Sequence, residues 1–214
     1  MMMNLFSSFD PCTGMMSLNW LSMMLMFIML PYNMWLIPNN NLIMINNIIN
    51  NIFIELKSNL KCLSSSILMM SIFLFIMMNN IMGLIPYIFT CSSHLLFSLT
   101  LSLPLWLSFI LYNSLKKTNL FLSHMVPYGT PIILMPFMVL IETTSNLIRP
   151  GSLAVRLTAN MIAGHILMSL LGNSSKIMIS FMLLVFMLLM IFEMAVSIIQ
   201  SYVFMTLTSL YSSE

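Results

Sequence analysis

Four ionisable residues stand inside one of the longest apolar stretches of this chain, residues 131–171: Glu142, Arg149, Arg156 and His165. Within a membrane an ionisable group costs at least about 2.5 kcal/mol on insertion scales, so each one needs a partner, water or a function. Glutamate and histidine can pass protons on near neutral pH once their surroundings shift them. Arginine stays charged to about pH 12 and beyond, so Arg156 is expected to act as a fixed positive charge.

The fixed charge of Arg156 separates the residues that can relay protons. On a straight helix, His165 lies about 13 Å from Arg156 along the axis and about 180° round it, and Glu142 lies about 21 Å away on the other side. A fixed cation attracts a passing carboxylate and opposes direct proton flow past itself. The spacing therefore predicts two separate proton routes, one on each side of Arg156.

Two helix faces carry the polar residues that accompany these groups. In the first stretch, Arg156 and Asn160 share a face with small residues that would let another helix approach closely: Ala159, Ala163 and Gly164. In a second apolar stretch, residues 177–211, one face carries Glu193, Ser197 and Gln200. Glu193 is the third candidate proton relay, and Asn160, Ser197 and Gln200 are expected to give polar support to the charged residues.

Each of these residues also has a plain structural interpretation. Glu142 and Arg149, seven residues apart, can form an ion pair along one helix face or between helices. Glu193 can be a structural partner of a neighbouring chain, and His165 can be a hydrogen-bonded core histidine. Arg156 can extend its guanidinium to the water interface, although its depth in the stretch argues against this.

The composition indicates a membrane protein. Hydrophobic residues make up 60% of the chain and charged residues 6%, against about 25% charged in soluble domains. Runs of about 20 apolar residues, enough to cross the bilayer, recur several times, and the alternating strands of a β-barrel are missing. We therefore expect an all-α polytopic membrane protein with a single membrane domain.

The sequence predicts no cofactor, metal or nucleic-acid partner. A net charge of +2 is too small to indicate nucleic-acid binding, and there is no GxxxxGK[ST] phosphate loop. The three cysteines, Cys12, Cys62 and Cys91, are too few and too widely spaced to indicate a disulfide framework or a zinc site. His94 and His124 are expected to lie in solvated loops.

The candidate residues must be positioned by long helices. We expect a first span over residues 15–37, an amphipathic interfacial helix over 42–60, spans over 67–87 and 95–112, and a hairpin of two long helices over 131–171 and 177–211. Asp10 and Pro11 read as the start of the first span. Forty helical residues extend about 60 Å, about twice the hydrocarbon thickness, so the hairpin must tilt steeply or bend, most simply at Pro150.

The lysines predict an orientation. With five crossings, one side of the membrane receives Lys57, Lys61, Lys116 and Lys117, and the other receives Lys176. Basic loops stay in the compartment where the chain is made, so the N-terminus is expected on the opposite side and the C-terminus on the basic side.

Five blocks of the chain resemble the subunit a family of mitochondrial F-type ATP synthases, in the same order: "NNIMGLIPYIFT", "LPLWL", "IETTSNLIRPGSL", "LAVRLTANMIAGH" and "FEMAVSIIQSYVF". The ending "LTSLYSSE" resembles arthropod versions. The resemblance implies one N-terminal transmembrane helix, an interfacial helix, two further spans and a steeply tilted hairpin packed on a ring of c subunits. In this family Arg156 matches the essential arginine that faces the ring carboxylates, with Asn160 and Gln200 as its polar neighbours.

The resemblance also implies roles for the relays. His165 and Glu193 match the pair of the inlet half-channel from the intermembrane space, and Glu142 matches a glutamate of the matrix half-channel. The partners would be the c-ring, other membrane and peripheral-stalk subunits, lipid and the transported proton. The chain would be a non-catalytic subunit of the mitochondrial inner membrane, with its N-terminus in the intermembrane space and its C-terminus in the matrix.

Two other functions fit the composition. An independent secondary transporter would use Arg156 to bind an anionic substrate, but the inverted repeats common in such transporters are not visible. A purely structural membrane anchor would tolerate replacement of Arg156, His165 and Glu193 without loss of proton conduction.

Overall fold

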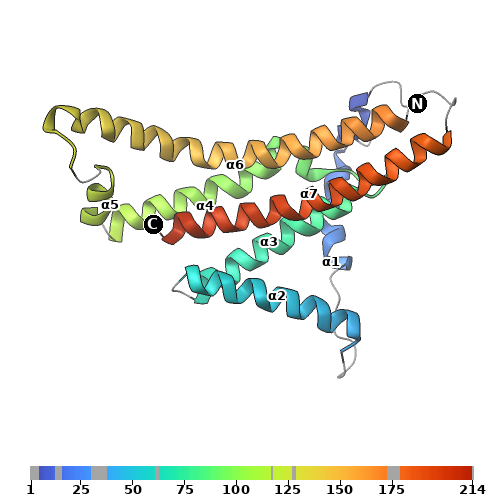
Figure 1. Ribbon diagram of the computed structural model, residues 1–214, viewed down its shortest axis with the longest axis horizontal. Coiled ribbons are helices and arrows are strands. Elements are labelled where there is room, and N and C mark those ends of the chain that lie inside the picture. The colour runs from blue at the N-terminus through green and yellow to red at the C-terminus, as the bar shows by residue number, and fades with distance from the viewer. Residues whose placement is uncertain are drawn as a thin grey trace.

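The computed structural model describes residues 5–12, 16–29, 38–60, 63–116, 118–126, 129–172 and 179–213, which form helices and turns without any β-strand. The α-helices are α1 Leu25–Met29, α2 Asn40–Asn59, α3 Leu63–Gly83, α4 Leu95–Lys116, α5 Thr118–His124, α6 Met135–Gly172 and α7 Ile179–Ser213 (Figure 1). Short 3-10 helices are η1 Leu5–Phe9, η2 Leu18–Met24, η3 Cys91–Ser93 and η4 Ile132–Leu134.

Four helical segments of the described residues are long and apolar enough to cross a membrane: Leu63–Gly83, Leu95–Lys116, Ile132–Gly172 and Phe181–Ser212. The prediction of an all-α polytopic membrane protein is confirmed. The helix α3 begins and ends four residues earlier than the predicted 67–87. Its end is followed by a turn that contains Pro86, a residue that cannot donate the hydrogen bond that a continuing helix needs.

The first predicted span, residues 15–37, is described only in part. Its described portion is the 3-10 helix η2 followed at once by the short α1, and residues 30–37 lie outside the described residues. Residues 10–12 are not helical, because the Asp10 Oδ1 accepts the Cys12 backbone N–H at 3.3 Å and closes a local turn. The prediction that Asp10 and Pro11 start this helix is therefore wrong.

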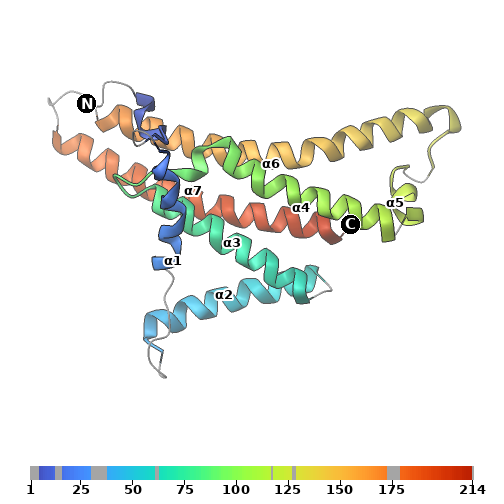
Figure 2. The ribbon, with the colours of Figure 1, turned by 180° about the vertical axis from the view of Figure 1, so that it is seen from behind.

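The helices α6 and α7 run side by side as a long hairpin (Figure 1). The 38 residues of α6 extend about 57 Å, about twice the hydrocarbon thickness. The helix continues through Pro150, which removes one backbone hydrogen bond, and Figures 1 and 2 show a smooth bow along α6 rather than a break. Residues 173–178, which connect the two helices, lie outside the described residues.

The helix α3 joins the hairpin to the rest of the bundle. Its apolar side chains enter two buried clusters. The first joins α3 to α2 and α7 and consists of Leu56, Leu60, Met69, Met70, Phe73 and Met205. The second joins α3 to α6 and α7 and consists of Ile76, Leu153, Leu157 and Phe204. Both clusters include a residue of α7, so α3 and α7 hold each other in a fixed register.

Hydroxyl groups within this apolar bundle are satisfied by their own helices. Ser66, Ser201 and Thr208 are buried, and each donates to a carbonyl three or four residues earlier at 2.7–3.0 Å. Such bonds let small polar residues occupy a membrane helix without a partner on another helix. The local hydrogen bonds therefore explain why these hydroxyl groups can be buried, without any functional role.

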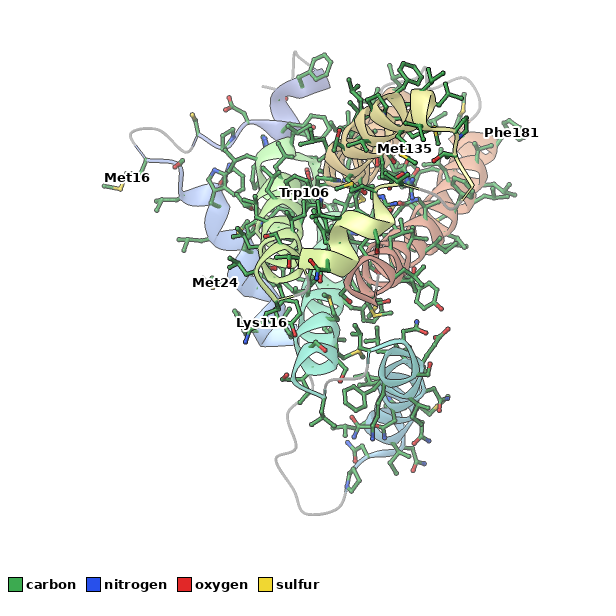
Figure 3. All side chains as sticks on the ribbon, turned by 90° about the vertical axis from the view of Figure 1, so that its left-hand side faces the viewer. Met16, Met24, Trp106, Lys116, Met135 and Phe181 are labelled. Carbon is green, nitrogen blue, oxygen red and sulfur yellow. The ribbon has the colours of Figure 1, made fainter. Side chains whose placement is uncertain are left out.

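The outer surface of the bundle is apolar, as lipid contact requires. In Figure 3, Met16 and Phe181 project from opposite sides of the bundle, and both are more than half exposed. The predicted interfacial helix corresponds to α2, which lies to one side of the hairpin beside α3 (Figures 1 and 2). Its Glu55 Oε1 accepts a hydrogen bond from the Tyr202 hydroxyl at 2.9 Å, which ties α2 to α7.

Candidate functional site

Arg156 lies on the outward surface of α6. Its side chain is exposed, and it forms no ion pair within the part of the chain that the structure describes. Several α6 residues on the same side are small and also exposed: Ser152, Ala159 and Ala163. A permanent charge on an apolar, small-residue surface can be approached closely by an acidic group of another molecule.

Gly164 does not share this open surface. It is buried, and a Cβ placed on it would overlap the carboxylate of Glu193 from α7. The small residues that were predicted to admit another helix therefore face two different surroundings. Gly164 admits α7 of the same chain, whereas Ala159 and Ala163 remain exposed.

Glu193 is buried within the bundle. Its side chain is 5% exposed, and it forms no ion pair among the described residues. Burial of a carboxylate without a counter-ion is costly, so this position is unfavourable for a residue that only stabilises the fold. A carboxyl group that takes up and releases a proton is consistent with such surroundings.

Asn80 on α3 is a polar neighbour of Glu193 that was not among the predicted site residues. It is fully buried, and its Nδ2 donates to the Ser197 carbonyl at 3.4 Å, one turn from Glu193. Its Oδ1 is also buried, without a hydrogen-bond partner in the described residues. Such an atom needs a water molecule or another donor, so Asn80 adds polarity next to the Glu193 face. The signal in the sequence was an Asn-Asn pair inside an apolar run.

His165 faces the interior side of α6, away from Arg156. It is half-buried, its Nε2 is buried without a hydrogen-bond partner among the described residues, and its ring lies edge-on to Phe9, with centroids 6.1 Å apart. No described residue supplies a hydrogen bond to this nitrogen, so the structure does not support a core histidine that is bonded through Nε2.

Glu142 lies near the other end of α6, where it has a partner. Its Oε1 is 4.0 Å from Nη2 of Arg149, and the Arg149 guanidinium also stacks over the Tyr211 ring of α7 at 4.9 Å from its centroid. Glu142 is still about two-fifths exposed. The predicted ion pair therefore exists, and it leaves the carboxylate accessible.

The remaining predicted residues take supporting positions. Asn160 on α6 and Gln200 on α7 are half-buried, and Ser197 is buried with its hydroxyl donating to the Met194 carbonyl at 2.7 Å. The Ser197 hydroxyl is thus satisfied within its own helix. Ser197 contributes to the site through its backbone carbonyl, which accepts the hydrogen bond from Asn80. No group of three or more potential metal ligands occurs among the described residues.

The prediction that His94 is solvated is wrong. It is half-buried between η3 and α4, its Nε2 lies 3.0 Å from the Phe9 carbonyl oxygen, and its ring packs against Trp20 and Phe89 at 5.3 and 5.2 Å. The physical reason is that the segment from α3 to α4 folds back onto α6 through η3, which no local pattern in the sequence reveals. The side chain of His124 lies outside the described residues.

The fold and the site together define a polytopic helical membrane protein with an outward-facing arginine and an inward-facing histidine on one helix and a buried acid on the next. Comparison with known proteins gives a consistent result. The family described as ATP synthase A chain matches residues 13–213. The chain is 53% identical to ATP synthase subunit a of Aedes aegypti and 52% identical to that of Drosophila melanogaster, in each case over 100% of this chain and 99% of the relative. The chain belongs to the ATP synthase A chain family.

Proposed function

We propose that this chain is the proton-translocating stator subunit of a mitochondrial rotary ATP synthase. Two offset half-channels deliver protons to and from the carboxylates of a c-ring, and Arg156 separates the two half-channels. The chain makes no phosphoanhydride bond itself, because catalysis belongs to other subunits of the complex. Proton passage is worth about 2.3 kcal/mol per charge per 100 mV, and this free energy turns the ring.

The observation that carries this proposal is the exposed guanidinium of Arg156, which forms no ion pair with any described residue and has small residues beside it. A charge in that position needs an opposite charge from outside the chain. A ring of identical subunits, each with one carboxylate, supplies such a charge repeatedly as it turns. The arginine attracts each ionised carboxylate and prevents protons from passing directly between the routes.

The inlet route uses Glu193 and His165. The Glu193 carboxylate lies against Gly164, the residue before His165, so this route passes through the contact between α6 and α7. The buried Nε2 of His165 and the buried Oδ1 of Asn80 mark places where water would be held in this apolar bundle. The outlet route uses Glu142, whose carboxylate is exposed near the opposite end of α6.

The proposed partners and location follow from the same function. The chain contacts the c-ring through the Arg156 face of α6 and contacts other membrane and peripheral-stalk subunits of the synthase elsewhere. It lies in the mitochondrial inner membrane, with its N-terminus in the intermembrane space and its C-terminus in the matrix. ATP-driven proton pumping and passive proton flux, recorded on the same vesicles with the complete synthase, test this function through the Arg156 variant described in the Discussion.

A glycine substitution tests whether Glu193 must occupy its observed position. In Gly164→Ala the new Cβ would overlap the Glu193 carboxylate. Because this carboxylate is the end of a flexible side chain, we expect it to turn aside while the complex still assembles, and we expect proton-driven ATP synthesis to fall several-fold. Gly151→Ala is the matched control, since a Cβ there meets no atom within 4 Å. Equal synthesis rates in the two variants would contradict the proposed position of Glu193.

The ion pair at the outlet gives a second test. If Glu142 relays protons, Glu142→Gln should lower proton flux several-fold, whereas Arg149→Gln should leave flux closer to the wild type because it removes only the partner. If Glu142 serves only to hold Arg149, breaking either end of the 4.0 Å pair should have the same effect, and the double variant should be no worse. Flux in vesicles across all three variants separates the two roles.

A further inference from the structure

The segment η1 lies over His165 and is held there by a second histidine. Phe9, the last residue of η1, places its ring edge-on to the His165 ring at an interplanar angle of 89°. The backbone carbonyl of the same residue lies 3.0 Å from Nε2 of His94. Because a carbonyl oxygen can only accept a hydrogen bond, Nε2 of His94 is the donor.

His94 is itself fixed on both sides. Its ring packs against Trp20 of η2 and against Phe89 in the segment after α3, and the Phe89 carbonyl accepts a hydrogen bond from the Ser22 hydroxyl at 3.2 Å. Both η1 and η3 contact α6. The position of Phe9 over His165 is therefore set by contacts from three separate segments of the chain.

We propose that His94 is a positioning residue that holds Phe9 as a shield over His165. The shield closes the direct approach of water to His165 from the N-terminal segment, so the imidazole exchanges protons only through groups inside the bundle, among them Glu193, whose carboxylate lies against the neighbouring Gly164. This inference rests on the proposed role of His165 as a proton relay. It gives a function to His94 and Phe9, two residues that have no role in the proposed half-channels.

Two features of His165 support proton exchange through the interior of the bundle. On one side, His165 faces the aromatic ring of Phe9, which has no lone pair or N–H donor to carry a proton. Its Nε2, in contrast, is buried without a partner among the described residues, as expected of an atom that contacts an internal water. Without the shield, water at η1 would reach the ring directly, and Glu193 would no longer control the inlet.

The accessibility of His165 tests the shield directly. The complete synthase in vesicles is treated with diethylpyrocarbonate, and the rate of His165 modification is followed by peptide mass spectrometry. We expect Phe9→Ala and His94→Ala to raise this rate several-fold, and His94→Gln, which keeps an N–H donor, to hold it near the wild-type value. Leu21→Ala is the matched control, because that apolar side chain lies on η2, beside the same segments, but is 61% exposed. A wild-type rate of His165 modification in Phe9→Ala would overturn the inference. If His94→Ala does not assemble, Phe9→Ala alone still tests whether Phe9 shields His165.

Proton flux tests the routing. If the shield forces protons past Glu193, flux lost in Glu193→Gln should be partly restored in Glu193→Gln/Phe9→Ala, because water then reaches His165 directly. Faster modification of His165 without any such rescue would overturn the routing. A separate His165→Ala variant with normal flux would instead refute the relay role of His165, whatever the modification rates show.

Discussion

Replacing Arg156 with alanine is expected to abolish ATP-driven proton pumping by the complete synthase, while passive proton flux stays equal to the wild type or rises. Truncating one partner of a desolvated charge pair costs about 2–5 kcal/mol, which corresponds to a loss of coupled pumping of at least about 25-fold at about 1.4 kcal/mol per factor of ten. Passive flux does not fall, because the change removes the cation that opposes direct flow between the half-channels. Both quantities are measured on vesicles of one preparation, with assembly verified on native gels.

Two further variants separate charge from shape at this position. Arg156→Lys keeps the positive charge on a shorter stem without the planar guanidinium, so it should retain more coupling than Arg156→Ala. Leu147→Ala removes a 62% exposed side chain from the opposite face of the same helix without changing any charge, and coupling should be nearly unaffected. Pumping at the normal rate in Arg156→Ala would show that the charge is structural and that the gate mechanism is wrong.

Glu193→Gln is the second change with a large expected effect. Glutamine has nearly the same shape as glutamate, so it can occupy the site beside Gly164, but it cannot bind and release a proton at neutral pH. A positioned proton-transfer group typically contributes about 10²–10⁴-fold to a rate, and we expect proton-driven ATP synthesis to fall by at least about a hundredfold on that scale. Synthesis is measured in energised vesicles against protein content.

The controls for Glu193 address folding and chemistry separately. Because glutamine removes a buried carboxylate that has no ion pair within the described residues, thermal stability of the complex should be unchanged or slightly higher. Glu193→Asp keeps a titratable group and should keep part of the activity. Ile191→Ala, at a position 72% exposed on the same helix, should have normal activity. A normal synthesis rate in Glu193→Gln would leave this glutamate with a packing role alone.

Apolar run lengths were sufficient to predict the elements that carry the site. A run of about 20 apolar residues is a direct physical requirement of the bilayer, so α3, α4, α6 and α7 could be placed from composition and length. Arg156 could be singled out for the same reason, since a guanidinium cannot become neutral in an apolar stretch. The start of the first helix could not be predicted from Asp10 and Pro11, because an Asp side chain closes a local turn as readily as it caps a helix.

Local composition is therefore enough to establish that this is a helical membrane protein and which of its ionisable residues lie within the spans. What each residue faces, in contrast, depends on the tertiary structure. It turned Arg156 outward, buried Glu193 against Gly164, brought Asn80 to the Ser197 carbonyl and placed Phe9 between His94 and His165. These contacts join segments far apart in the chain, and helical periodicity gives the angle of a side chain around its own axis but not the identity of the neighbour at that angle.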